Sequence, residues 1–246
     1  MTRDAPTPTV AQVGLIALFV TALVTAQLTA SKVLAFELPV DLPVTGAELL
    51  LPGAALAYAI TFLASDCYTE LYGRRAAQVV VNVAFAMNLV LLALVWSTIV
   101  APGHPSGVEP EAFADVLGAG TAIVLGSLVA YLVSQNYDVI VFHRIGVLTE
   151  GRYLWLRNIV STGTSQIIDT VLFVTIAFWV FPQYVGLGPE LPAGVVLSLI
   201  VGQYLLKLAI VVVDTPFVYL ITGLIHRYEP PSGRPVSTDA QGQNSP

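Results

Sequence analysis

Long apolar runs are the feature that most constrains how this chain can fold. Stretches such as AQVGLIALFVTALVTAQLTA at 11–30 continue for about 20 residues, the length of a helix that crosses ~30 Å of hydrocarbon. Only 11% of the 246 residues are charged, less than half of the ~25% found in an ordinary soluble domain. So few charges cannot cover a water-facing surface. The sequence therefore predicts an all-α membrane protein, a bundle of transmembrane helices.

We expect six transmembrane helices in one domain that covers residues 11–228. Polar segments with proline or glycine separate most of them, for example APGHPSGVEPEAFAD and PQYVGLGPELP. The segment ELPVDLPVTGAE, between the first two spans, is interpreted as a loop, and Pro52-Gly53 as a helix start. Disorder is predicted for residues 1–10 and for the Pro/Ser/Gly/Gln-rich tail at 229–246. The expected spans are approximately 11–30, 49–72, 76–100, 118–142, 159–181 and 194–225.

The basic residues predict which side of the membrane each loop faces. Loops after the third and fifth expected spans contain acids and no lysine or arginine. Arginines lie instead before the first span, after the second, after the fourth and after the sixth: Arg3, Arg74, Arg75, Arg144, Arg152, Arg157, Arg227 and Arg234. The positive-inside rule then places both termini in the cytoplasm of a multi-pass protein of the inner or plasma membrane.

Several functional classes lack their expected signals. One cysteine, Cys67, excludes an internal disulfide, and three scattered histidines give no zinc site. An intramembrane enzyme is an alternative of another class, but the sequence has neither HExxH nor GxSxG. We therefore expect no catalytic residue, no metal and no cofactor. No basic face suggests nucleic acid as a partner.

Polar side chains recur at helical spacing along one face of four expected spans, which suggests that they face a common interior. The third span offers only Asn82 and Asn88, which do not share a face well, and it is interpreted mainly as scaffold. The four stripes, in chain order, are Tyr58, Phe62, Asp66 and Glu70; Ser127, Tyr131, Ser134 and Asp138, with Gln135 beside them; Thr162, Gln166, Asp169 and Phe173; and Gln203, Lys207 and Asp214.

Five carboxylates and a lysine on these faces exceed what helix packing needs. A charge at the bilayer centre costs at least ~2.5–3.5 kcal/mol, and the polar groups that join membrane helices are usually Ser, Thr or Asn. Lys207 is the counter-charge for one acid. For Asp66, Glu70 and Asp138, which lie near the cytoplasmic ends of their helices, interhelical hydrogen bonding remains the alternative. The pattern favours a cavity for a small polar solute.

The chemistry of the stripes suggests a flat solute that donates hydrogen bonds. A carboxylate accepts well from adjacent N–H groups, such as those on the edge of guanine. Aromatic rings can stack on a planar heterocycle, which contributes ~1–3 kcal/mol per base in nucleic-acid sites. The rings available on the stripes or beside them are Tyr58, Phe62, Tyr131, Phe173 and Tyr204.

Five segments together resemble the queuosine precursor transporter family, whose members are also described as vitamin uptake transporters. The resemblance implies six helices and the uptake of 7-deazaguanine bases, 7-cyano-7-deazaguanine and its aminomethyl derivative, which are precursors for tRNA modification. It does not indicate which energy source drives uptake. The segments are FLASDCYTELYGRR (62–75), AYLVSQNYDVIVFHRI (130–145), WLRNIVSTGTSQIIDTVLFVTIAFW (155–179), QYLLKLAI (203–210) and TPFVYLI (215–221).

The resemblance also implies which positions bind substrate. Gln166 stands where the family usually has an amide, and Glu70 and Asp214 match less securely. We expect Asp169, Asp66 or Asp138 to accept from the base, Gln135 and Gln166 to orient it, and Lys207 to balance charge. Tyr131 and Gln203 are, with Glu70 and Asp214, weaker candidates. The positions that match the family's polar residues are Asp66, Gln135, Asp138, Ser161, Asp169 and Lys207.

The expected function is import of such a base across the membrane, with the lipid bilayer and a small molecule as partners. An alternative is a substrate-binding membrane subunit that works with a separate ATPase, since the sequence has no GxxxxGK[ST] loop of its own. A homo-oligomer also remains open. A structural or signalling membrane protein is disfavoured by the buried carboxylates.

Overall fold

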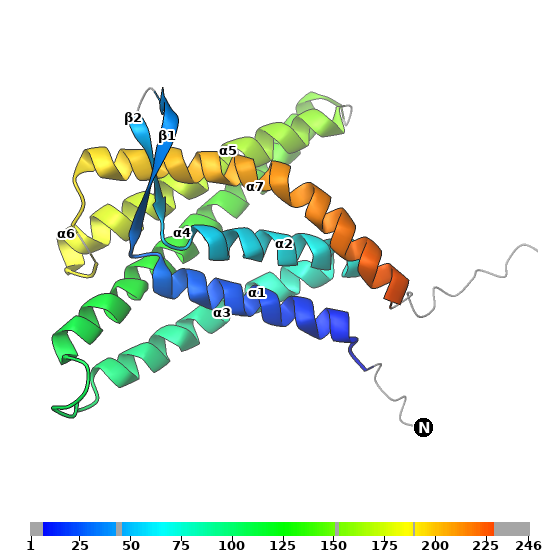
Figure 1. The fold of residues 1–246 in the computed structure, drawn as a ribbon. Helices are drawn as coiled ribbons and strands as arrows, with labels where there is room; N and C mark the ends of the chain where they lie inside the picture. Colours follow the sequence, from blue (N-terminus) through cyan, green and yellow to red (C-terminus); the bar gives the residue numbers. More distant parts are fainter. Residues whose placement is uncertain (1–6, 43–45, 151–152, 189, 229–246) are drawn as a thin grey trace, which may run out of the picture.

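The computed structural model describes residues 7–42, 46–150, 153–188 and 190–228. Most of the segments predicted to be disordered, 1–10 and 229–246, lie outside the described residues, as do Arg3, Arg152 and Arg234. The chain is mostly helical (Figure 1). In chain order the elements are α1 (Val10–Thr29), β1 (Val33–Leu42), β2 (Gly46–Pro52), α2 (Ala55–Tyr72), α3 (Arg74–Ile99), α4 (Pro110–Leu148), α5 (Leu154–Thr175), a π-helical turn (Ile176–Val180), α6 (Phe181–Val185) and α7 (Ala193–Tyr228).

Within the described residues, five helical segments are long and apolar enough to cross a membrane, as expected for a multi-pass protein. They are Val10–Thr29, Arg74–Ile99, Pro110–Leu148, Ile159–Val185 and Ala193–Tyr228. The remaining expected span corresponds to α2, which has 18 residues but contains Asp66 and Glu70 and is more polar. Six crossings therefore stay a prediction.

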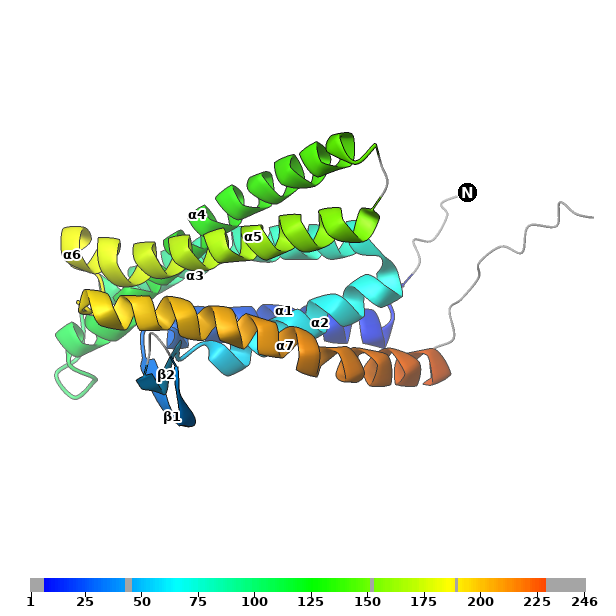
Figure 2. The same cartoon turned by 90° about the horizontal axis from the view of Figure 1, so that it is seen from above.

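The long helices run side by side and alternate in direction (Figures 1 and 2). The first residue of α1 and the last residue of α7 lie at the same end of the bundle, together with the α2–α3 and α4–α5 connections. Only Gly73 separates α2 from α3, and its φ of 87° belongs to a backbone region that residues with a Cβ rarely adopt. The opposite end carries the α3–α4 connection, α6 and the hairpin base.

The segment between the first two expected spans was predicted as a loop, and this prediction is wrong. Strands β1 and β2 form an antiparallel hairpin in which Val33 pairs with Pro52 and Glu37 with Glu48. Residues 49–52, expected to begin the second span, belong to β2, and α2 begins only at Ala55. Pairing satisfies the backbone groups of two extended segments next to an apolar bundle, where unpaired groups are costly. The N–H of Gly53 donates to the carbonyl of Lys32 (2.6 Å) and closes the hairpin base.

The hairpin is held against α7 by a close backbone contact. It projects sideways from the bundle beside the first half of α7 (Figure 2). Gly202 of α7 is buried directly against the carbonyl of Leu50, so that a Cβ at this position would collide with backbone. Leu51 is buried at the same contact. Glycine normally destabilises a helix, but at position 202 the close approach of β2 leaves no room for a Cβ.

Helix α4 is longer than the expected span 118–142. It has 39 residues, roughly 58 Å at 1.5 Å per residue, which exceeds the ~30 Å hydrocarbon core. Pro110 and Glu111 lie in its first turn, where a proline and a negative charge suit a helix N-terminus. Glu111 and Asp115, which were assigned to a loop, are therefore helical.

Small residues let α4 pack closely on the helix formed by α5, the π-helical turn and α6. A Cβ on the buried Gly126 would lie 3.2 Å from the Cβ of Ala177. Close approach at small residues is the usual way in which membrane helices associate. The resulting core joins α4, α5, the π-helical turn and α7, with Ile123, Val174, Phe178 and Leu199 at its centre.

Candidate functional site

A cavity of about 240 Å³ lies inside the bundle. Its wall comes from six helices: α1, α2, α3, α4, α5 and α7. The polar side chains in the wall are Gln27, Thr61, Ser65, Ser127, Ser134, Gln135, Gln166, Asp169 and Gln203. The aromatic side chains are Phe19, Tyr58, Phe62, Phe85, Tyr131 and Phe173. Amides, hydroxyls, one carboxylate and rings thus face one cavity.

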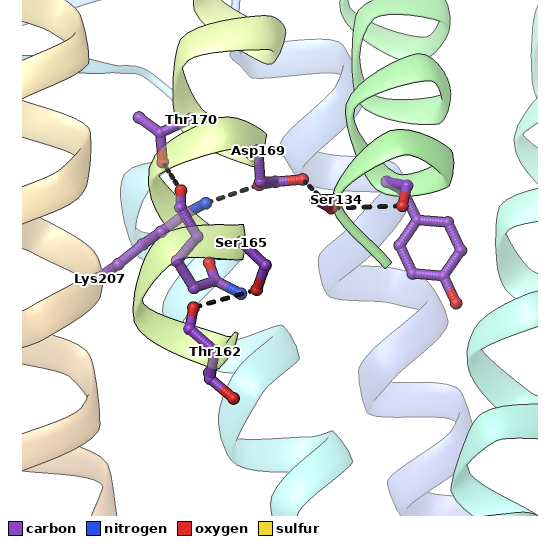
Figure 3. A network of polar contacts seen from close by, with 8 residues as sticks. Ser134, Thr162, Ser165, Asp169, Thr170 and Lys207 are labelled. Carbon is purple, nitrogen blue, oxygen red and sulfur yellow. Dashed lines mark hydrogen bonds and ion pairs between the residues drawn. The ribbon is translucent and has the colours of Figure 1, made fainter. Parts of the chain in front are cut away.

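An ion pair joins α5 to α7 at the cavity wall (Figure 3). The Nζ atom of Lys207 donates to Oδ2 of Asp169 over 2.7 Å. The hydroxyl of Ser134, on α4, lies 3.3 Å from the other carboxylate oxygen and 3.2 Å from the carbonyl of Tyr131, so these two acceptors share its one proton. Lys207 is almost fully buried, with 5% of its side chain exposed, whereas Asp169 keeps 19% exposed. Lys207 also lies 5.9 Å from the ring centre of Tyr58. Asp169 is therefore held by two neighbouring helices.

The hydroxyls around this pair are satisfied within the protein, as a membrane interior demands. Thr170 donates to the carbonyl of Gln166, one turn earlier in α5 (Figure 3). Ser165 lies 3.0 Å from the carbonyl of Thr162 and 3.3 Å from the carboxylate of Asp138 on α4. The contact between Ser165 and Asp138 gives α4 and α5 a second polar link.

Helix α3, expected to act mainly as scaffold, supplies part of the cavity wall. Phe85 stacks on Tyr131 of α4 with ring centres 4.6 Å apart and planes inclined by 15°. The hydroxyl of Tyr131 donates to Asn82 (3.0 Å) and accepts from Gln78 (2.7 Å). These contacts fix the orientation of a ring that the sequence analysis placed among the weaker candidates.

The structure separates the candidate residues into two groups. Five candidates line the cavity: Gln135, Gln166, Asp169, Tyr131 and Gln203. Lys207 does not line it but forms an ion pair with Asp169, which does. The candidates that do not line it are Asp66, Glu70, Asp138, Ser161 and Asp214.

Asp169 is the only Asp or Glu among the described residues of the wall. Of the three carboxylates expected as acceptors, Asp66, Asp138 and Asp169, it alone lines the cavity. Ser161 is fully buried in α5, and Asp66 is exposed on α2. Tyr204 does not line the cavity, whereas Phe19 and Phe85 do.

Gln27 on α1 also lines the cavity, although it was not among the residues expected to do so. Gln27 is 4% exposed, and its Oε1 atom has no hydrogen-bond partner in the described part of the chain. It lies on one face with Phe19 and Leu23, at i, i+4 and i+8, and all three line the cavity. Its position could have been noticed in the sequence, because an amide side chain in an otherwise apolar membrane span is costly to bury and needs a hydrogen-bond partner.

Comparisons with known proteins decide the family. The model of a family described as "Putative vitamin uptake transporter" matches residues 52–221, which run from the end of β2 into α7. The chain belongs to this family.

Two curated relatives agree with the family. A Bacillus subtilis (strain 168) protein named "Probable queuosine precursor transporter" is 31% identical over 169 residues, which cover 68% of this chain and 70% of the relative. An Escherichia coli (strain K12) protein named "Queuosine precursor transporter" is 30% identical over 146 residues, 58% of this chain and 62% of the relative. No solved structure matches the chain.

The family confirms the resemblance noted in the sequence, and it settles the functional class. This chain is a multi-pass membrane transporter and not an enzyme. The matched residues include the Asp169–Lys207 pair and most of the cavity wall, whereas α1, with Gln27, lies before them.

Proposed function

We propose that this chain imports a queuosine precursor, a 7-deazaguanine base such as 7-cyano-7-deazaguanine, and that the base binds in the cavity. The observation that carries the proposal is the convergence of Gln135, Gln166 and Asp169 with aromatic rings around one cavity within the bundle. A guanine-like base offers adjacent N–H donors, a carbonyl acceptor and a flat π surface, which these groups match. The names of both curated relatives support the same substrate class.

The size of the cavity supports a base rather than a larger conjugate. Its volume of about 240 Å³ is just below the ~300–1,000 Å³ of sites for drug-sized ligands. A fused two-ring heterocycle suits such a space better than the same heterocycle with a ribose attached. Free bases are therefore the proposed cargo.

Asp169 can contact the base and Lys207 at the same time. A carboxylate has about four lone-pair positions, and Lys207 and Ser134 occupy two of them. Its 19% exposed fraction leaves an edge open to the cavity. In this arrangement Lys207 holds the carboxylate in place, while Gln135 and Gln166 fix the orientation of the base.

We further propose that the domain at 11–228 crosses the cell membrane six times, with both termini in the cytoplasm. At 1.5 Å per residue the 18 residues of α2 extend ~27 Å, close to the thickness of the hydrocarbon core. Arg74 and Arg75 begin α3, and Arg144 and Arg227 lie near the last residues of α4 and α7. The start of α3 and the ends of α4 and α7 lie at the end of the bundle where α1 begins, which agrees with the positive-inside rule.

A host that cannot synthesise queuosine precursors provides the test. Cells expressing this chain receive 7-cyano-7-deazaguanine at low concentration, and queuosine in their tRNA is measured. We expect modified tRNA with the natural chain, and loss of it with Asp169→Asn and with Lys207→Ala at equal amounts of protein in the membrane. Val212→Ala, on an exposed surface of α7, serves as the matched control.

Two results would refute the proposal. One is unmodified tRNA in cells that contain the natural chain in their membrane. The other is uptake at the natural level by both site variants. Repeating the assay in a host without candidate ATPase partners separates a self-sufficient importer from a substrate-binding subunit, because only the latter would then fail.

A further inference from the structure

Among the described residues of the cavity wall, the one carboxylate is already paired with a cation of the protein. Oδ2 of Asp169 accepts from the Lys207 ammonium (2.7 Å), and Oδ1 lies 3.3 Å from the Ser134 hydroxyl, which also contacts the carbonyl of Tyr131 (3.2 Å). No other Asp or Glu is found among the described residues that line the cavity. Lys207 itself lies outside that lining and is 5% exposed. The wall therefore offers polar groups but no free negative charge.

Two amides in the wall each have an oxygen atom without a hydrogen-bond partner among the described residues. Gln27 on α1 and Gln203 on α7 are 4% and 7% exposed, and both line the cavity. The Oε1 atom of each is buried without a hydrogen-bond partner among the residues that the structure describes. A buried polar atom left unpaired is destabilising, so such atoms call for a partner that the folded chain alone does not supply. Because each of these oxygen atoms has almost no accessible surface, a molecule bound in the cavity can be that partner once the amide turns toward it.

An amide and a carboxylate recognise different ligands. A side-chain amide both donates and accepts without carrying charge, and so it suits the polar edge of a neutral heterocycle. An ammonium group that enters a buried site loses its hydration and requires a free carboxylate in exchange. The aromatic rings of the wall attract cations, but this attraction is weaker than the lost hydration.

We propose that the cavity selects an uncharged planar base over the same base carrying an ammonium group, and that the amides of Gln27 and Gln203 bind its polar edge. This inference rests on the import function proposed above. Among 7-deazaguanines, it favours a 7-cyano substituent, which is neutral. It disfavours a 7-aminomethyl substituent, a primary amine that is protonated at neutral pH, as lysine is.

Binding to the purified, full-length chain tests the selectivity directly. Radiolabelled 7-cyano-7-deazaguanine is bound in detergent or nanodiscs, and each unlabelled base is added as a competitor at pH 7. We expect the cyano base to compete at a concentration at least about tenfold lower than the aminomethyl base. Equal competition, or tighter binding of the aminomethyl base, overturns the inference while leaving the proposed function intact. Absence of binding by either base overturns both.

A charge-introducing variant tests the role of the amide. Gln27→Glu places an unpaired carboxylate in the wall with almost no change in shape, and we expect it to shift the preference toward the aminomethyl base by about tenfold or more. Gln203→Glu provides the same test from α7 if the first variant fails to fold. Gln183→Glu, exposed on α6 outside the cavity, adds an equal charge and should leave the ratio unchanged. An unchanged ratio in well-folded Gln27→Glu and Gln203→Glu would overturn the assignment.

Discussion

Asp169 and Lys207 depend on each other at the scale of single residues. Each is an ionised group within a membrane bundle, and their 2.7 Å contact compensates part of the cost of removing both charges from water. The remaining carboxylate oxygen is held by Ser134. The two side chains are therefore expected to tolerate joint replacement better than the loss of one partner.

Lys207→Met should destabilise the protein by about 3–5 kcal/mol, because it leaves a partly buried carboxylate without its counter-charge. The double variant Lys207→Met with Asp169→Asn should recover more than half of that loss, since it removes both charges. Unfolding of the purified chain in mixed detergent measures both. Additive losses in the double variant would show that the pair is not coupled.

The sequence predicted the participants in this contact only in part. Lys207 was expected to balance one acid, but Asp66, Asp138, Asp169 and Asp214 all lie on inward stripes. Helical spacing places residues on one face of their own helix and does not fix which neighbour that face meets. The choice of Asp169 depends on how α5 and α7 pack. Gln27 went unnoticed because α1 carries no stripe of polar residues around it.

At the scale of elements, the contact between the β-hairpin and α7 shapes the end of the bundle at which α1 ends and α2 begins. Gly202 permits the contact, since it places helix backbone against the Leu50 carbonyl. Gln203 follows Gly202 directly and lines the cavity. The hairpin thus helps to position one wall of the site.

Gly202→Ala should therefore destabilise the protein, although alanine is the better helix former by about 1 kcal/mol. The added methyl group would collide with strand backbone, which cannot move aside as a flexible side chain can. Gly194→Ala, in the same helix but with open space around it, is the matched control and should be neutral or stabilising. Thermal unfolding of the two variants compares them, and equal melting temperatures would contradict the packing described.

The helices could largely be predicted from apolar runs, whereas the hairpin could not. A short apolar strand and the start of a buried helix look alike in sequence, and LLPG at 50–53 was assigned to the helix. The length of α4 was underestimated for a related reason. Its first turns contain acids that suit a helix N-terminus but were counted as loop.

At the scale of the whole molecule, the alternation of helix directions predicts which connections face each side of the membrane. Single cysteines test this in a Cys67→Ala background, in which no other thiol remains. Ser106→Cys, in the exposed α3–α4 connection, should react with a membrane-impermeant maleimide in intact cells. Tyr228→Cys, at the exposed last residue of α7, should react only after lysis. The reverse pattern would invert the proposed orientation.

The expected spans and orientation follow from hydropathy and charge, which are properties of local sequence. The cavity does not, because its wall combines residues from six helices whose tilts and rotations are set by packing. Residues such as Phe85 and Gln27 join it from helices that the sequence analysis treated as scaffold or as plain spans. The chemical class of the solute could still be inferred, since the types of polar residue on the inward faces are known from the sequence, whichever way the helices pack.

Exchange across a membrane that contains only this chain tests the central claim most directly. Liposomes reconstituted with the purified protein and loaded with unlabelled 7-cyano-7-deazaguanine are placed in labelled base, an assay that requires no energy source. We expect labelled base to accumulate inside and Ala130→Phe, which fills the cavity, to abolish this. Val129→Phe, on the exposed face of the same turn, should retain it. Absence of exchange by the natural chain, or equal exchange by both variants, would contradict transport of the base through this cavity.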